Sequence, residues 1–340
     1  MASVRVSTSL MLGMCAALLA ASATAAEVNL YTIREPGLIK PMLDAFTEKT
    51  GIKTNTIFLK DGLAERVAAE GANSPADILM TVDVGNLVDL ADKGLTQPIK
   101  SSALDAAVPA NLRDPEGRWY ALSLRGRLVY VAKAHKLTAI AYEDLADPKW
   151  KSKICIRSGQ HPYNTALTAA MIAKHGETKA EDWLRAVKAN LARKPTGGDR
   201  EVARDILGGV CDIGVGNSYY VGLMRSGAGG PDQKKWGDSV DIVLPKFAGG
   251  GTHVNISGAA LAKNAPNRDS ALKLLEFLAS DEGQKLYAEA NFEYPVKKGV
   301  KTSPIIEDLG QLNVDAMSLA DVAKYRKQAS ALADKVGFDN

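Results

Sequence analysis

The sequence predicts an α/β protein of two lobes, and three observations support this prediction. Segments with strand and helix patterns alternate along the chain, which is typical of a largely parallel sheet covered by helices. An export signal of 26 residues would leave 314 of the 340 residues, which favours two domains over one. No repeat or low-complexity linker separates two parts, so we expect strands to cross between the lobes and a cleft to lie between them.

Residues 1–26 have the composition of a secretory signal peptide. Arg5 is their one charged residue, an apolar run covers residues 10–20, and small residues lead to Ala26. The apolar run is shorter than the roughly 20 residues that span a bilayer. Cys15 lies inside the run and not at a lipoprotein cleavage site. The mature chain is therefore expected to be exported and to begin at residue 27.

The first part of the mature chain alternates between strands and helices. Apolar residues recur at helical spacing between positions 39 and 46, and Gly51 fits the C-terminal cap of that helix. Asp83 fits an N-cap. The predicted strands are 28–32, 52–59 and 76–81, and the predicted helices are 39–49, 63–70 and 87–93.

A short β-rich stretch follows, and further α/β units complete the chain. Segment 241–245 is expected to cross between the lobes. The glycines at 249–251 lack the Gly-Lys-Ser/Thr ending of a phosphate loop, which favours a flexible connection. The predicted strands here are 119–122, 128–131, 153–156 and 211–215, and the predicted helices are 164–174, 181–192, 269–279, 282–290 and 319–336.

The net charge and the cysteine content indicate which kinds of protein this chain can be. The net charge of +3 becomes +2 when Arg5 is removed, which gives no support for nucleic-acid binding. Cys155 and Cys211 remain in the mature chain, and two cysteines in an exported protein favour one disulfide. A cysteine metal site is the weaker alternative, because there is no Cys-x-x-Cys and no histidine at ligand spacing.

Several sequence runs point to a known family. The run 45–52, after the first strand, is common to solute-binding proteins, and the paired tyrosines of 216–220 are more specific. The other specific runs are 76–83, 192–200, 251–258, Ala265-Pro266-Asn267 and 286–289. Over nearly the whole mature chain, the sequence resembles the ferric-iron-binding proteins of the Fbp and Fut group.

This resemblance implies a fold, a location and partners. The fold is the two-lobed periplasmic-binding-protein fold, with 27–123 and 247–292 in the N-terminal lobe and 124–246 and 293–340 in the C-terminal lobe. The chain would act in the periplasm as a monomer without catalysis. It would capture Fe³⁺ and deliver it to an inner-membrane ABC permease and its ATPase.

The resemblance also implies a ligand set. In that family tyrosine phenolates bind Fe³⁺, and the matching positions here are Tyr163, Tyr219 and Tyr220. A cleft arginine that pairs with a bound anion in many members matches Arg125, with Arg127 as the alternative. Arg34, in the run after the first strand, is expected near the metal or its anion.

One run departs from the family pattern. Many members carry Tyr-Ser-x-Arg-His-Tyr after the first strand, whereas this chain has Tyr31-Thr32-Ile33-Arg34-Glu35-Pro36. The proline cannot ligate through its side chain. Either the N-terminal lobe supplies no protein ligand or Glu35 substitutes for the histidine. Carbonate or another small anion is then expected to complete the coordination shell.

The chemistry of tyrosine suits ferric iron. Fe³⁺ is a hard cation that prefers oxygen donors, and its charge can ionise phenols whose pKa is ordinarily about 10. Adjacent tyrosines of a strand point to opposite faces, so Tyr219 and Tyr220 can share a metal only in a turn or at a helix start. The preceding Gly216-Asn217-Ser218 favours such a start.

Two alternatives remain open from the sequence. A polyamine, a sugar phosphate or another anion could be the solute, with Arg125 binding it directly. A secreted metalloenzyme or hydrolase is the alternative from a different class. It lacks support because the chain has no Gly-x-Ser-x-Gly elbow, no His-Glu-x-x-His and no cluster among its four histidines.

Overall fold

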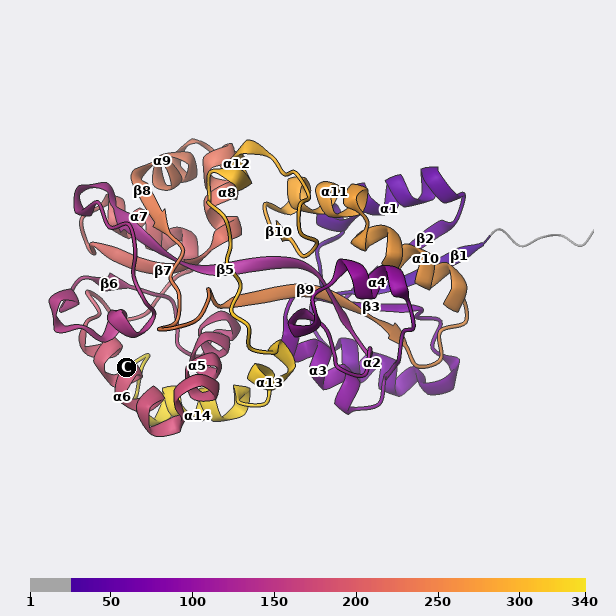
Figure 1. Cartoon of the computed structure of the whole chain (residues 1–340), viewed down its shortest axis with the longest axis horizontal. Helices are drawn as coiled ribbons and strands as arrows, with labels where there is room; N and C mark the ends of the chain where they lie inside the picture. Colours follow the sequence, from indigo (N-terminus) through magenta and orange to yellow (C-terminus); the bar gives the residue numbers. More distant parts are fainter. Residues whose placement is uncertain (1–25) are drawn as a thin grey trace, which may run out of the picture.

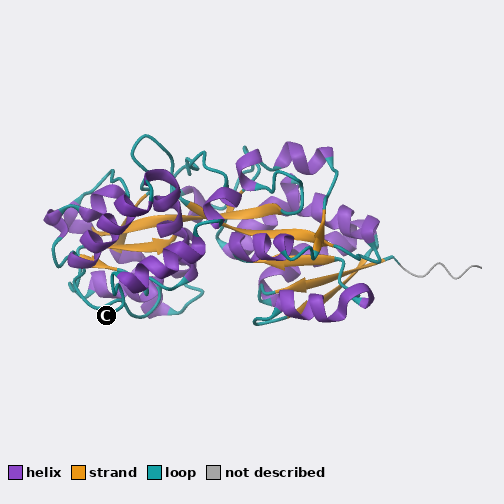
Figure 2. Cartoon of the chain, turned by 90° about the horizontal axis from the view of Figure 1, so that it is seen from below, coloured by secondary structure: helices purple, strands orange, loops and turns teal. Residues whose placement is uncertain are grey.

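Two lobes joined by long strands make up the molecule. The structure, a computed structural model, describes residues 26–340, so the predicted signal peptide lies outside the described residues except for Ala26. Strands β5 (Tyr120–Ala132) and β9 (Val254–Ala262) run between the lobes (Figure 1). Helices cover the strands of each lobe (Figure 2). None of the helices within residues 26–340 has the length and apolar character needed to cross a bilayer.

The N-terminal lobe is built on a sheet with the order β2-β1-β3-β9-β5. Strand β1 is parallel to β2 and β3, as the alternating pattern predicts, whereas β9 is antiparallel to β3 and to the first half of β5. The remaining strands of this sheet are β1 (Glu27–Thr32), β2 (Lys53–Phe58), β3 (Ile78–Thr81), β4 (Thr96–Gln97) and β10 (Tyr294–Pro295).

The helix ends of this lobe follow from the capping residues that the sequence indicates. Gly51 adopts the left-handed conformation (φ 70°) and its N–H donates to the carbonyl of Thr47, which confirms the predicted cap. The Asp83 carboxylate accepts from the N–H of Gly85 at 2.8 Å and so caps the third helix. The helices of this lobe are α1 (Pro36–Thr50), α2 (Leu63–Glu70), α3 (Val84–Asp92), α4 (Ser102–Ala107), α10 (Arg268–Ala279) and α11 (Asp281–Asn291).

The second lobe continues the sheet from β5 through β7 to β6. Strands β6 (Ile154–Cys155) and β7 (Ile213–Asn217) are parallel, and β8 (Val240–Val243) pairs antiparallel with β5. Its helices are α5 (Pro162–His175), α6 (Glu177–Ala189), α7 (Asp199–Leu207), α8 (Ser218–Ser226), α9 (Pro231–Ser239) and α14 (Arg326–Lys335). Two short helices, α12 (Pro304–Glu307) and α13 (Leu319–Ala323), precede α14, and α13 contacts both α3 and α5. The residue boundaries of the lobes stay a prediction.

The prediction of two separate strands at 119–122 and 128–131 was wrong, because β5 is one continuous strand. The residues between them continue the strand, and its first half pairs with β9 while its second half pairs with β7. Gly126, inside this continuous strand, lies where the chain packs closely. A Cβ there would lie 3.1 Å from the side chain of Leu312 and 3.2 Å from that of Leu128.

Two further predictions were wrong. Segment 241–245 does not cross between lobes, because β8 pairs with the end of β5 inside the second lobe. The segments that cross are β5 and β9 (Figure 1). The single helix predicted for 319–336 is divided near Tyr325 into α13 and α14, which make different tertiary contacts, a feature that helical periodicity does not encode.

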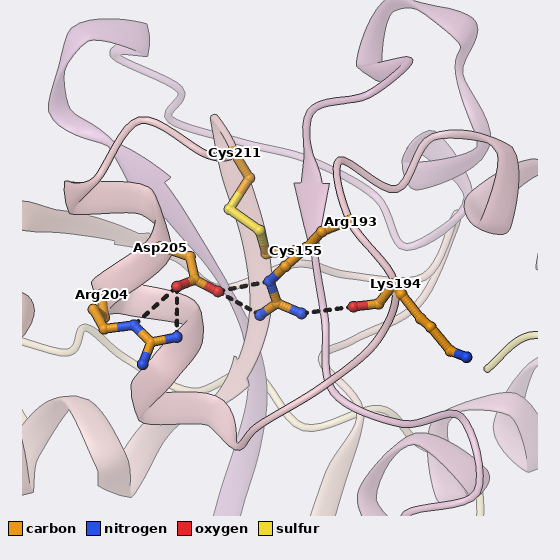
Figure 3. The surroundings of a disulfide bond; sticks show 6 residues. All are labelled: Cys155, Arg193, Lys194, Arg204, Asp205 and Cys211. Atoms are coloured by element: carbon orange, nitrogen blue, oxygen red, sulfur yellow. Dashed lines mark hydrogen bonds and ion pairs between the residues drawn. A yellow bond between two sulfur atoms is a disulfide. The ribbon is translucent and has the colours of Figure 1, made fainter. Parts of the chain in front are cut away.

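The predicted disulfide between Cys155 and Cys211 is present, with a Cα–Cα distance of 5.8 Å. It joins β6 to the residues that lead into β7, and both cysteines are buried. Arg193, Asp205 and Arg204 form an ion-pair cluster close to it (Figure 3). The disulfide therefore ties together two neighbouring parallel strands of the second lobe.

Replacing both cysteines by alanine should lower the free energy of unfolding. The bond closes a loop with a sequence separation of 56 residues, and the chain-entropy model assigns such a loop roughly 4 kcal/mol. Denaturant unfolding followed by circular dichroism would measure the change. Reduced wild-type protein should match the variant, and an unchanged midpoint would contradict the assignment.

His253 is a buried histidine in the residues that lead into β9. Its backbone N–H donates to the hydroxyl of Tyr142, and its ring lies near Phe247. Burial, together with the positive charge of Arg127, lowers the pKa of His253 to about 3. An unfolded histidine has a pKa of about 6.5. The unfolded chain therefore binds a proton between pH 6.5 and about 3 that the folded chain does not.

The free energy of unfolding should accordingly fall as pH decreases from 6.5 towards 4. A His253→Gln variant loses this contribution, so its stability should depend less steeply on pH over that range. Urea unfolding at a series of pH values would give both slopes. Equal slopes for the wild type and the variant would show that His253 is not buried in its neutral form.

Candidate metal centre

Tyr219 and Tyr220 lie side by side at the start of α8. Strand β7 ends at Asn217, whose extended backbone (φ −80°, ψ 146°) leads into the helix at Ser218. The two ring centroids are 4.0 Å apart and the ring planes are inclined by 33°. The helix start predicted from the turn residues is confirmed, and it avoids the opposite orientation that a strand would impose.

Tyr163 joins this pair from a second helix. It lies in the first turn of α5, where the imidazole of His161 accepts from its backbone N–H at 3.3 Å. The hydroxyl oxygens of Tyr163 and Tyr219 are 3.2 Å apart. The three predicted tyrosine ligands thus gather at two helix N-termini, whose partial positive charge favours negative groups.

Burial keeps Tyr219 and Tyr220 protonated in the absence of a cation. Burial is the largest cause that raises the pKa of Tyr219 well above its usual value, followed by the charges that Tyr163 and Tyr220 would carry. Burial and the charge of Tyr163 also raise the pKa of Tyr220. The neighbouring phenols therefore oppose each other's ionisation, and a multivalent cation between them would remove that opposition.

Arg125 lies on β5 next to the tyrosines. Its guanidinium is buried and donates to the carbonyls of Ile256, at 2.7 Å, and Val82. Its Cζ atom lies 5.7 Å from the ring centroid of Tyr163. Burial lowers the pKa of Arg125, but the charges of Glu293 and Tyr163 outweigh it and the net shift is upward. A permanent positive charge therefore stands beside the phenols.

Arg127, two residues further along β5, is occupied by protein groups. Its guanidinium donates to Asp199 at 2.6 Å, to Asn164 at 2.6 Å and to Asn217 at 3.1 Å. Its side chain and that of Asp199 are both buried. In this arrangement Arg127 binds polar groups of three different segments of the second lobe.

Arg34 and Glu35 differ in their surroundings. The guanidinium of Arg34 is buried and pairs with Glu293 at 2.7 Å, and it also donates to Asn291 at 2.5 Å and to Ser257. Burial lowers the pKa of Arg34, but the charge of Glu293 outweighs it, and the net shift is upward. Glu35 is exposed at the start of α1 and makes no side-chain cap there.

Four charged residues that surround the tyrosines or pair with Arg34 were not assigned from the sequence. Arg157 lies 5.3 Å from the ring centroid of Tyr163, and Arg200 lies 5.6 Å from that of Tyr220. Arg200 and Asp199 fall inside the run 192–200, which carries the family resemblance. Glu293 has no local signal, because its partner Arg34 is 259 residues away.

Within residues 26–340, no group of three or more histidine, cysteine, aspartate or glutamate side chains is arranged to hold a metal ion. The clustered oxygen donors at this site are phenols. Hydroxyl oxygens of this kind suit hard cations, which prefer oxygen ligands.

Comparison with known proteins places this chain in a family. A model described as bacterial extracellular solute-binding protein matches residues 73–309. Iron uptake protein A2 of Synechocystis is 40% identical over 322 residues, which cover 94% of this chain and 92% of that protein.

Solved structures agree with the sequence comparison. A Bordetella ferric binding protein is 64% identical, covers 92% of this chain and 100% of its own, and superposes with a TM-score of 0.90. FutA (IdiA) of Trichodesmium, solved in complex with iron and citrate ligands, is 41% identical with a TM-score of 0.88, over 92% of this chain and 99% of its own. The predicted family and two-lobed fold are confirmed, and the chain belongs to the bacterial extracellular solute-binding proteins.

Proposed function

We propose that this protein captures Fe³⁺ with the phenolates of Tyr163, Tyr219 and Tyr220 and delivers it to an ABC importer. The observation that carries the proposal is the convergence of three phenols from two helix starts, with two hydroxyl oxygens 3.2 Å apart. The names of relatives that cover most of this chain, an iron uptake protein and a ferric binding protein, support the same solute.

The site chemistry supports a trivalent ion. The raised pKa values of Tyr219 and Tyr220 keep both phenols protonated at neutral pH, so a bound cation must compete with protons. Three phenolates neutralise the charge of Fe³⁺. As pH falls, the phenolates become protonated, so the affinity for iron should fall as well.

A small anion, such as carbonate, is proposed to complete the coordination shell. Arg125 and Arg157 lie within 6 Å of the ring of Tyr163, and Arg200 lies as close to that of Tyr220. These cations would offset the negative charge that an anion adds. Arg125 is the residue proposed to face the anion, and Glu35 is the alternative oxygen donor from the N-terminal lobe.

Delivery requires a membrane partner. The family is one of extracellular solute-binding proteins, and we propose the periplasm as the location, consistent with the signal-like residues 1–26. The partners proposed are an inner-membrane permease and its ATPase. Opening of the cleft between the lobes would release the ion.

Adding ferric citrate to the mature, metal-stripped protein at neutral pH should produce a broad visible band from phenolate-to-iron charge transfer. Tyr219→Phe and Tyr220→Phe should lose most of the band and weaken iron binding at least about tenfold, equivalent to about 1.4 kcal/mol. Visible titration measures both effects. Bicarbonate added to the iron-loaded protein should shift the band if carbonate completes the shell.

Tyr31→Phe provides the matched control, because the Tyr31 hydroxyl bonds to Glu70 in the N-terminal lobe and not to the site. This variant should keep the wild-type band. If folded wild-type protein shows no band, phenolate ligation of iron is wrong. An organic solute bound by Arg125 would then be the function to test.

A further inference from the structure

Asp199 is a fully buried carboxylate at the first position of α7. One of its oxygens accepts from Arg127 at 2.6 Å and from the backbone N–H of Asn217 at 2.8 Å. The other oxygen accepts from Arg157 at 3.5 Å. This carboxylate therefore binds side chains or backbone of three separate segments, although it contacts none of the tyrosines by a hydrogen bond.

The residues that bind Asp199 also contact the two segments that bear the tyrosines. Asn217 is the N-cap residue of α8 and lies two residues before Tyr219. Arg127 also donates to the side chains of Asn217, at 3.1 Å, and Asn164, at 2.6 Å. Asn164 follows Tyr163 directly. The Arg127–Asp199 ion pair thus holds the first turn of α5 and the first turn of α8 at once.

A second route from Asp199 reaches Tyr163 through Arg157. The Cζ atom of Arg157 lies 5.3 Å from the ring centroid of Tyr163, and the backbone carbonyls of Arg157 and Ser158 accept from the Asn164 side chain. The same carboxylate therefore restrains both the backbone beside Tyr163 and the cation over its ring.

Stability alone does not require this pair. Removing two charges from water costs several kcal/mol per ion, and well-packed apolar residues can replace a buried ion pair with little loss or with a gain in stability. An ion pair with directional bonds to two asparagines instead fixes where two helix starts lie. Sites that bind ions tightly depend on such preorganisation.

We infer that Asp199 and Arg127 are positioning residues that set the separation of Tyr163 from Tyr219 and Tyr220, and thereby the rate of iron release. This inference rests on the proposed function. It assigns to Arg127 a role in holding the phenols, whereas the sequence resemblance gave it as the alternative to Arg125 beside the anion. The expected consequence of losing the pair is a looser set of ligands in a protein that still folds.

Asp199→Asn tests the inference, because asparagine keeps the shape and one accepting oxygen but removes the charge that pairs with Arg127. The visible band should shift or weaken, and iron loss to an excess of a strong chelator should speed up at least about tenfold relative to wild type. Stopped-flow absorbance measures the rate, and thermal unfolding of the metal-free protein measures stability.

Asp205→Asn is the matched control on the same helix. Asp205 is also buried and pairs with two arginines, Arg193 at 2.6 Å and Arg204 at 2.8 Å, but it lies at the far end of α7 beside the disulfide (Figure 3). Its substitution should lower the thermal unfolding temperature comparably and leave the band and the release rate at wild-type values. The control separates positioning from general destabilisation.

Arg127→Lys is the second variant, to be used if Asp199→Asn does not fold. Lysine keeps the positive charge beside Asp199 but lacks the planar fork that reaches both asparagines. Arg127→Lys should change the band and the rate of iron release in the same direction as Asp199→Asn does. Wild-type band and release rate in a folded Asp199→Asn or Arg127→Lys protein would overturn the inference, as would equal changes in Asp205→Asn. A wild-type protein without any band would instead overturn the proposed function, and the inference with it.

Discussion

Strand β5 changes its neighbour between Gly126 and Arg127, and the arrangement of the site depends on this change. Up to Gly126 the strand pairs with β9, and from Arg127 it pairs with β7. Arg125 consequently bonds to carbonyls of Val82 and Ile256, whereas Arg127 bonds to Asp199 and two asparagines of the second lobe. One continuous strand therefore carries neighbouring arginines that serve different lobes.

The electrostatics of the site follow from burial. Phenols that are close together and shielded from water resist ionisation, and nearby guanidinium groups compensate only partly for this effect. Tyr219 and Tyr220 are therefore neutral without a bound cation and become anionic when a cation displaces their protons. A covalent bond also restrains the site. The disulfide joins β6 to the residues that lead into β7, and these two strands precede the tyrosine-bearing helices α5 and α8.

Local signals in the sequence predicted much of this structure. Gly51 and Asp83 cap the helices that they indicated, the two mature cysteines pair, and the turn residues before Tyr219 begin a helix. Only the family resemblance predicted that Tyr163 lies close to Tyr219 and Tyr220, because sequence spacing does not indicate that α5 and α8 meet. Glu293 and Asp199 were missed, since their partners lie far away in the sequence. The continuity of β5 was missed because its two halves pair with different strands, a tertiary feature with no local signal.

The most direct test of the account counts the tyrosines that ionise when iron binds. Near-ultraviolet difference spectra recorded during a ferric titration at neutral pH report tyrosinate formed per ion bound. We expect three tyrosinates per Fe³⁺ in the wild type, and one fewer in each of Tyr163→Phe, Tyr219→Phe and Tyr220→Phe that still binds iron. Iron binding without tyrosine ionisation, or with the same count in the variants, would contradict ligation by these phenolates.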